Sequence, residues 1–150
     1  MNTDLVAQKA IDKLNRDGFD QLSETEKTTV TVWLFEGQVQ NRGFARFFAH
    51  ATGDVAFHAP AALQTIGALQ MAEIAAKANS VFGANGPPRE RNARKALVEA
   101  FTETTRKELR TLEGIFFECH EDVDELLEKY LVTLGSGNVS GENAATKAMG

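Results

Sequence analysis

Apolar residues recur at helical spacing along most of the chain. A first stripe has apolar residues three or four positions apart and closes at Asp17-Gly18; it comprises Leu5, Val6, Ala10, Ile11 and Leu14. The last stripe comprises Val123, Leu126, Leu127, Tyr130, Leu131 and Leu134. No segment between them alternates apolar and polar residues as a half-buried strand does. The pattern predicts an all-α fold.

Local signals mark the ends of the helices in the first half of the chain. Ser23 and Glu26 have the spacing of a capping box, which predicts the start of a second helix with Val30, Trp33 and Leu34 on one face. The segment 41–43 ends that helix, and we expect Gly43 to adopt a positive φ there. A short aromatic helix follows, and its residues Phe44, Phe47 and Phe48 are expected to join Trp33 in the core.

The second half predicts further helices around one main loop. One helix begins near Ala59, with Pro60 in its first turn, and another spans 69–82. After the loop 83–88, a single long helix is expected from Arg89 to Phe116. Residues 1–134 should therefore form one compact helical bundle of about six or seven helices. Residues 135–150, rich in Gly, Ser, Asn and Ala, are predicted to be a flexible, disordered tail.

The composition is that of a globular protein that needs no covalent or metal cross-link to fold. A chain of 150 residues with 43% hydrophobic residues is long enough to bury a core without a disulfide or a metal. Its one cysteine, Cys119, excludes an internal disulfide and is expected to be a small buried apolar residue. Because the chain shows neither a signal-peptide pattern nor an apolar run of membrane-spanning length, we expect a soluble, cytoplasmic protein.

The charge balance argues against direct binding of nucleic acid. The formal net charge is −5, and an acidic surface repels the phosphate backbone. No phosphate-binding loop and no nucleophile elbow occur in the sequence. We therefore expect neither a cofactor nor direct contact with nucleic acid.

Three histidines are the only candidates for metal or general-base chemistry. His50 and His58 flank Asp54, so a His/Asp/His site is conceivable, although this spacing matches no established ligand pattern. Roles as helix caps or surface residues are expected instead for His50, His58 and His120. An enzyme with a site around His50, Asp54 and His58 remains an alternative.

A run of carboxylates near the C-terminal helix is the clearest charge feature. Between residues 113 and 128 there is no Lys or Arg, and the acidic residues are Glu113, Glu118, Glu121, Asp122, Asp124, Glu125 and Glu128. A basic stretch that includes Arg106, Lys107 and Arg110 precedes them. The two stretches could pair within the fold. Alternatively, the carboxylates form an exposed ridge that binds a basic partner.

Two stretches of sequence resemble a known family. One extends from Trp33 to Asp54 and contains the run 37–44, Phe47-Phe48 and Gly53-Asp54. The other contains Leu112-Glu113, Phe116-Phe117, Asp122-Val123-Asp124, Leu126-Leu127 and Tyr130. In the region between the two stretches, the family's connecting segments are matched by Ile66-Gly67-Ala68 and Pro87-Pro88. Over residues 29–134 the chain is similar to a bacterial family of unknown function whose best-known member is a DNA-mimic protein.

The resemblance implies an all-helical fold, a homodimer and an acidic surface that occupies the DNA-binding face of a transcription factor. The chain departs from the family at Arg42, where a second glycine is usual, and at Arg46, which adds another positive charge. Our first hypothesis is a non-enzymatic regulator that binds a transcription factor or another basic protein, as an acidic DNA mimic. An immunity-type protein that blocks a toxin is the second.

Overall fold

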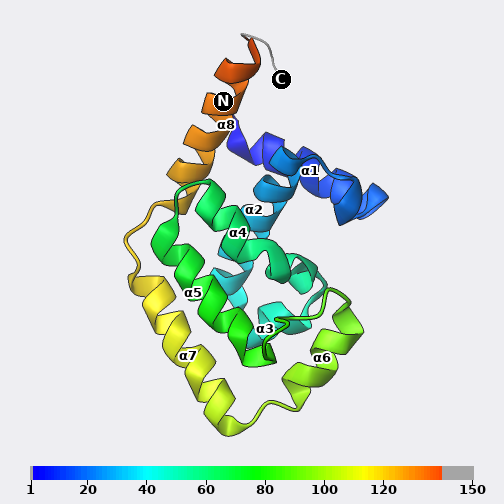
Figure 1. Cartoon of the computed structure of the whole chain (residues 1–150), viewed down its shortest axis with the longest axis vertical. Coiled ribbons are helices and arrows are strands. Elements are labelled where there is room, and N and C mark those ends of the chain that lie inside the picture. The colour runs from blue at the N-terminus through cyan, green and yellow to red at the C-terminus, as the bar shows by residue number, and fades with distance from the viewer. Residues whose placement is uncertain (1, 140–150) are drawn as a thin grey trace.

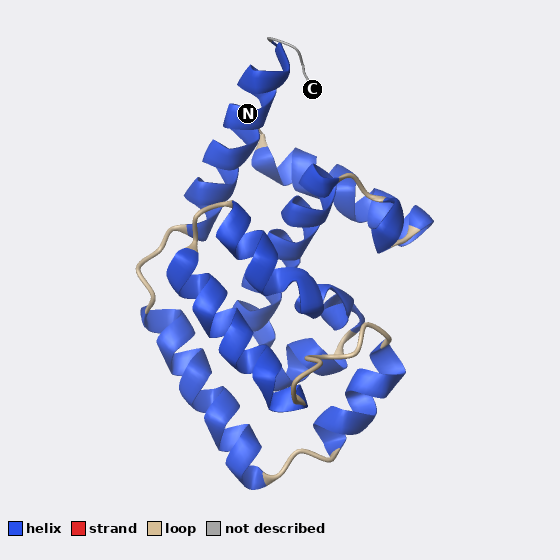
Figure 2. Ribbon diagram, in the orientation of Figure 1, coloured by secondary structure: helices blue, strands red, loops and turns tan. Residues whose placement is uncertain are grey.

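Helices are the only regular secondary structure in the part of the chain that the structure describes. The computed structural model describes residues 2–139, and the side chains of residues 2–134. Within this range there are eight α-helices, three short 3-10 helices and no strand (Figures 1 and 2). They are α1 (Thr3–Asp17), η1 (Phe19–Gln21), α2 (Glu24–Arg42), α3 (Phe44–Ala49), η2 (Ala51–His58), α4 (Ala59–Thr65), α5 (Leu69–Asn79), η3 (Ser80–Phe82), α6 (Arg91–Glu99), α7 (Glu103–Glu118) and α8 (Val123–Val139). The predicted fold class is confirmed.

Helix α2 is the centre around which the other helices pack. It contacts α1, α3, α4 and α8, while α5 packs on α4 and α7 packs on α5 (Figure 1). Its burial is not restricted to one stripe, because Val30, Val32, Phe35 and Val39 are all buried. A helix with neighbours on several sides has to bury several faces.

Phenylalanine rings form much of the core. Phe44, Phe47 and Phe48 are 0–1% exposed, so the prediction that these three residues belong to the core is confirmed. Phe35 of α2 meets Phe47 edge to face, with 5.8 Å between the ring centroids. Trp33 differs from the prediction, since it is only half-buried at the edge of this core.

Two helix ends follow the local signals in the sequence. The predicted capping box is present: the Ser23 hydroxyl accepts from the Glu26 amide at 3.1 Å, and the Glu26 carboxylate accepts from the Ser23 amide at 2.8 Å. At the other end of α2, Gly43 has a φ of 81°, as expected for a glycine that closes a helix.

The single long helix predicted from Arg89 to Phe116 is wrong. The structure has α6 and α7 instead, separated at residues 100–102 (Figure 1). The Thr102 hydroxyl accepts from the Thr105 amide at 3.1 Å, so this threonine caps a new helix. Gly114 lies inside α7.

The last helix extends beyond Leu134, where the predicted domain ends. Helix α8 continues to Val139, and the rest of the predicted tail, 140–150, lies outside the described residues. Among the described residues, no helix combines the length and the apolar character needed to cross a membrane.

Candidate functional site

The start of α8 presents the densest group of carboxylates. Asp122 accepts a hydrogen bond from the Glu125 amide at 3.0 Å and so caps the helix, while Glu125 pairs with Lys129 at 3.0 Å. Asp124 and Glu128 are exposed, and neither forms an ion pair or a hydrogen bond within the described residues. Their spacing of four residues puts both on one face of the helix, where they are available to a partner.

These carboxylates line two adjoining hollows. The α1–α8 hollow has a volume of about 460 Å³ and is lined by Thr3, Asp4, Trp33, Asp122, Asp124, Glu125 and Glu128. The α2–α8 hollow, of about 300 Å³, is lined by Glu36, Gln40, Met71, Phe116, Phe117, Cys119, Glu121, Asp122, Val123 and Asp124. Asp122 and Asp124 belong to both, and among the described side chains no Lys or Arg lines either one. The two hollows together are called the acidic hollows below.

Glu36 and Asp4 are members of the site that the sequence analysis missed. Glu36 is on α2 and Asp4 is on the first turn of α1, so both are far along the chain from the acidic run. Burial raises the pKa of the Glu36 carboxyl, and the negative charges of Asp124 and Asp122 raise it further. A positive charge placed in the α2–α8 hollow would relieve this repulsion.

Two of the predicted partner-binding carboxylates instead close the starts of other helices. Glu121 accepts from the amides of Gln70 and Met71, at 2.9 and 2.7 Å, at the start of α5. Glu113 accepts from the Phe44 amide at 2.8 Å, at the start of α3. In both cases a carboxylate distant in sequence satisfies amides that the helix itself leaves free.

Glu118, the remaining member of the predicted ridge, is exposed at the end of α7. It lines a separate depression between α5 and α7 that also contains Cys119. Cys119 is half-buried rather than fully buried, and its Sγ lies 3.8 Å from a carboxylate oxygen of Glu121.

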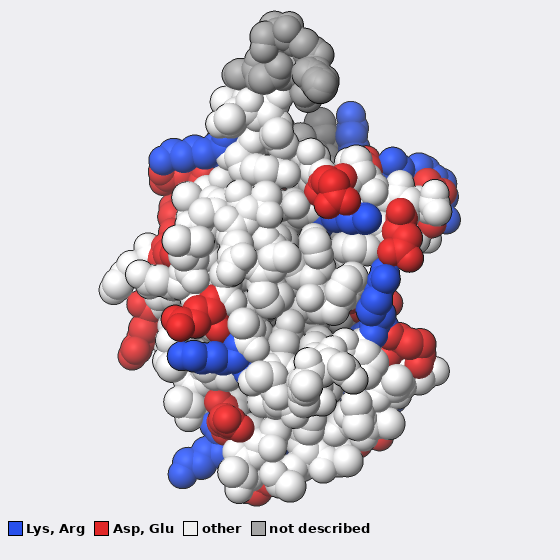
Figure 3. Space-filling view, in the orientation of Figure 1, with Lys and Arg blue, Asp and Glu red and all other residues white. Residues whose placement is uncertain are grey.

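The basic stretch does not neutralise the acidic run within the described residues. Arg110 pairs with Glu103 at 2.6 Å, and Arg106 donates to the Val98 carbonyl at 2.8 Å. Neither Arg42 nor Arg46, the two departures from the family pattern, lines an acidic hollow. Figure 3 shows that on one face the charged side chains lie at the margins, whereas α4 and α5 present mainly uncharged atoms.

His50, Asp54 and His58 serve separate contacts. The Nδ1 atom of His50 accepts from the Thr52 amide at 3.1 Å and caps η2, whereas His58 packs against Phe19 with 5.5 Å between the ring centroids. Burial lowers the pKa of both histidines. Asp54 lines a different cavity, to which neither histidine contributes.

Asp54 is the counter-ion of a buried arginine. Arg94 is 0% exposed, and its Nη1 lies 2.9 Å from the Asp54 carboxylate. Nε and Nη2 donate to the carbonyls of Phe48 and His50, each at 2.7 Å, and Nη1 also donates to those of Pro88 and Arg89, at 3.1 and 2.8 Å. Across residues 2–139 no group of three or more His, Cys, Asp or Glu side chains is placed to hold a metal ion.

Comparison with known proteins gives one match. The model of the DMP19-like protein family matches residues 20–134, which includes everything from η1 to the core-facing part of α8. No curated protein and no solved structure matches the chain. The matched region contains six of the carboxylates of the acidic hollows but not Asp4 of α1, because α1 precedes it.

Proposed function

We propose that this chain, which belongs to the DMP19-like protein family, is a non-enzymatic regulator that binds the basic surface of another protein through its acidic hollows. The observation that supports this most directly is that carboxylates from α1, α2 and the start of α8 converge on two hollows that no Lys or Arg of residues 2–134 lines. A basic surface gains from such an arrangement in both affinity and rate of encounter.

The same arrangement favours mimicry of DNA as the mode of binding. Duplex DNA presents one negative charge per ~1.7 Å of its axis, whereas charges four residues apart on a single helix are separated by roughly 6 Å. Asp4, Glu36 and the α8 carboxylates come from different elements and meet at one site, which raises the density of charge. We therefore propose that the partner is a DNA-binding protein, such as a transcription factor, whose DNA-binding face enters the hollows. A homodimer would present two such sites.

The test is affinity capture from the source cell with three forms of the protein. The wild type is compared with Asp124→Lys/Glu128→Lys, which reverses the two carboxylates of α8 that form no ion pair or hydrogen bond within the described residues. A matched control, Glu99→Lys/Glu108→Lys, makes the same change in net charge at exposed positions of α6 and α7 that line neither hollow. We expect the wild type and the control to retain a basic protein that the first variant loses.

Duplex DNA then distinguishes the modes of binding. If the partner is held through its DNA-binding face, added duplex DNA should release it from the wild type. A partner that stays bound in excess DNA would contradict mimicry and would fit another basic protein, such as a toxin. Equal capture by both double variants would contradict the assignment of the site to the hollows.

A further inference from the structure

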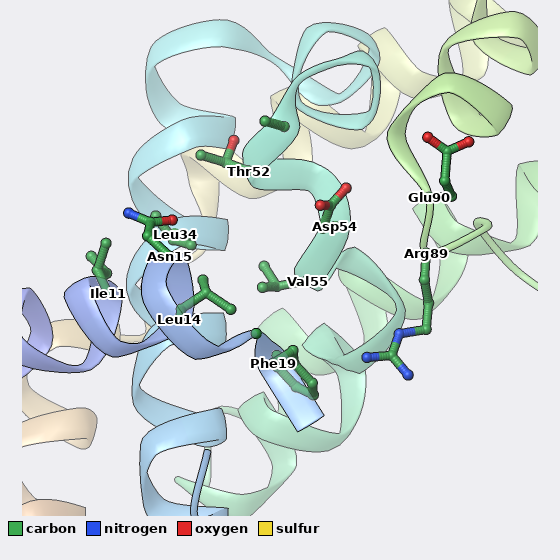
Figure 4. A pocket seen from close by; sticks show the side chains of 12 residues that line it. Ile11, Leu14, Asn15, Phe19, Leu34, Thr52, Asp54, Val55, Arg89 and Glu90 are labelled. Atoms are coloured by element: carbon green, nitrogen blue, oxygen red, sulfur yellow. The ribbon is translucent and has the colours of Figure 1, made fainter. Parts of the chain in front are cut away.

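A further cavity of the protein is separate from the acidic hollows. It has a volume of about 560 Å³ and lies between α1 and η1 on one side and η2 and the start of α6 on the other (Figure 4). It is lined by Ile11, Leu14, Asn15, Gly18, Phe19, Leu34, Ala51, Thr52, Asp54, Val55, Arg89 and Glu90. Its volume is within the range of small-molecule sites, roughly 300–1,000 Å³.

One wall of the cavity is apolar and incompletely covered. The side chains of Ile11, Leu14 and Phe19 are half-buried, and they face Leu34 and Val55 in Figure 4. The α1 part of this wall precedes residue 20, where the match to the DMP19-like family begins. The family match therefore covers the part of the lining that comes from α2, η2 and the segment before α6, and not the part that comes from α1.

The positive charges at the mouth of the cavity are already paired. Arg89 donates to Asp20 at 2.8 Å and lies over the ring of Phe57, 4.4 Å from its centroid. The buried Arg94 is bound to Asp54, as described above. An anionic ligand would have to compete with these ion pairs, so the cavity does not favour one.

The unused polar atoms at the mouth favour a ligand that donates hydrogen bonds. The Asp54 side chain is 54% exposed, and within the described residues only one of its carboxylate oxygens is bonded, to Arg94. The amide of Asn15 is exposed and unbonded among the same residues. Glu90 adds negative charge beside them, although both of its oxygens accept from the first amides of α6.

We propose that this cavity binds a hydrophobic amine, that is, a molecule with an apolar body and a protonated nitrogen. The body would occupy the wall formed by Ile11, Leu14 and Val55, and the ammonium group would bond the free oxygen of Asp54. Removal of apolar surface from water supplies the affinity, and the charge-assisted hydrogen bond sets the orientation. The site is independent of the partner-binding role proposed above.

The first test compares two probes that differ only in their charged group. We expect 4-phenylbutylamine to bind with a dissociation constant in the millimolar range or below, which is usual for a ligand of this size. The acid 4-phenylbutyrate should bind at least about tenfold more weakly, because its carboxylate would lie beside the carboxylate of Asp54 and not beside an unpaired cation. Methyl resonances of Ile11, Leu14 and Val55 should shift on titration of the wild-type protein with the amine.

A second test blocks the cavity from α1. Asn15→Trp places an indole at its mouth and should weaken amine binding by about tenfold or more, since the volume is then occupied. Gln8→Trp is the matched control, at an exposed position of α1 two helical turns earlier that does not line the cavity. The Gln8→Trp variant should bind the amine with the same affinity as the wild type. The proposal is overturned if the amine does not bind, if the acid binds equally well, or if the shifts lie elsewhere or survive Asn15→Trp.

Discussion

Gly53 is the glycine with the least room for a side chain within the described part of the chain. A Cβ atom added there would lie 2.4 Å from the Phe47 carbonyl oxygen and 3.1 Å from Nη2 of Arg94. The neighbouring Asp54 supplies the counter-charge for the same guanidinium. The Gly53-Asp54 pair, which the sequence analysis noted only as part of a family pattern, therefore has a structural explanation in the burial of Arg94.

Replacement of this glycine should destabilise the fold. We expect Gly53→Ala to lower the free energy of unfolding by about 1–3 kcal/mol or more, because the methyl group would overlap the Phe47 carbonyl oxygen and would lie 3.1 Å from the Phe48 carbonyl that Arg94 binds. Gly114→Ala is the control: no neighbouring atom would lie within 4 Å of the added methyl group inside α7, so a gain of up to about 1 kcal/mol is expected. Denaturant melts of both variants measure the two effects. A neutral Gly53→Ala would contradict the close approach.

Glu36 gives the stability of the protein a dependence on pH. Its pKa is raised in the folded state by burial and by Asp124 and Asp122, so its ionisation opposes folding. The contribution of Glu36 to stability is fully present below the ordinary pKa of a glutamate, about 4.3. It decreases as the pH rises toward the raised pKa of the folded state, and it is fully lost above that value. Glu36→Gln should therefore raise the melting temperature at neutral pH and lose this advantage at low pH.

The control for this experiment is Glu99→Gln, which alters an exposed carboxylate of α6 outside the acidic hollows. Its melting temperature should follow that of the wild type at every pH. If Glu36→Gln melts below the wild type at neutral pH, the carboxylate stabilises the fold, and the electrostatic account of the hollow is wrong.

At the scale of helices, carboxylates from distant segments define where α3 and α5 begin. Glu121→Ala removes the acceptor for two amides at the start of α5 and should cost about 0.5–2 kcal/mol. Glu118→Ala, three residues earlier and exposed, should change stability by less than about 0.5 kcal/mol. Equal melting temperatures for the two variants would show that the contact to α5 contributes nothing.

Helix ends that depend on neighbouring residues could be predicted, and those that depend on tertiary contacts could not. The capping box at Ser23 and the glycine at 43 are local signals, and both predictions are confirmed. The break between α6 and α7 was missed because the apolar period continues through it from Leu97 to Leu109, which obscured the cap at Thr102.

At the scale of the whole molecule, the site is assembled from segments that are far apart in sequence. The acidic run drew attention to α8 because its carboxylates are consecutive. The sequence contains no signal that Asp4 or Glu36 would join them, since only the packing of α1 and α8 against α2 brings these elements together. Glu113 is bound at the start of α3 and lines neither hollow, whereas Glu121 lines the α2–α8 hollow and is also bound at the start of α5.

Some carboxylates of the site have a second contact and others do not, and this difference decides which variants can test binding. Reversal of Glu121 would disturb α5 as well as the site, and reversal of Glu125 would remove its ion pair with Lys129. Asp124 and Glu128 have no such second contact within the described residues. Their reversal should therefore leave the fold within about 0.5 kcal/mol of the wild type, so that any change in partner binding can be assigned to the hollow.

The rate of association is the quantity that this double reversal should change most. If the hollows attract a basic surface, the association rate of the captured partner should fall steeply with salt, because exposed charges are screened beyond a Debye length of about 8 Å at physiological ionic strength. Asp124→Lys/Glu128→Lys should lower that rate by about tenfold or more at low salt and change dissociation much less. Surface plasmon resonance over a salt series measures both rates.

Glu99→Lys/Glu108→Lys should retain the wild-type salt dependence, because the local field and not the net charge steers the partner. An association rate that is insensitive to salt would remove the electrostatic basis of the proposed function, even if the two proteins bind tightly.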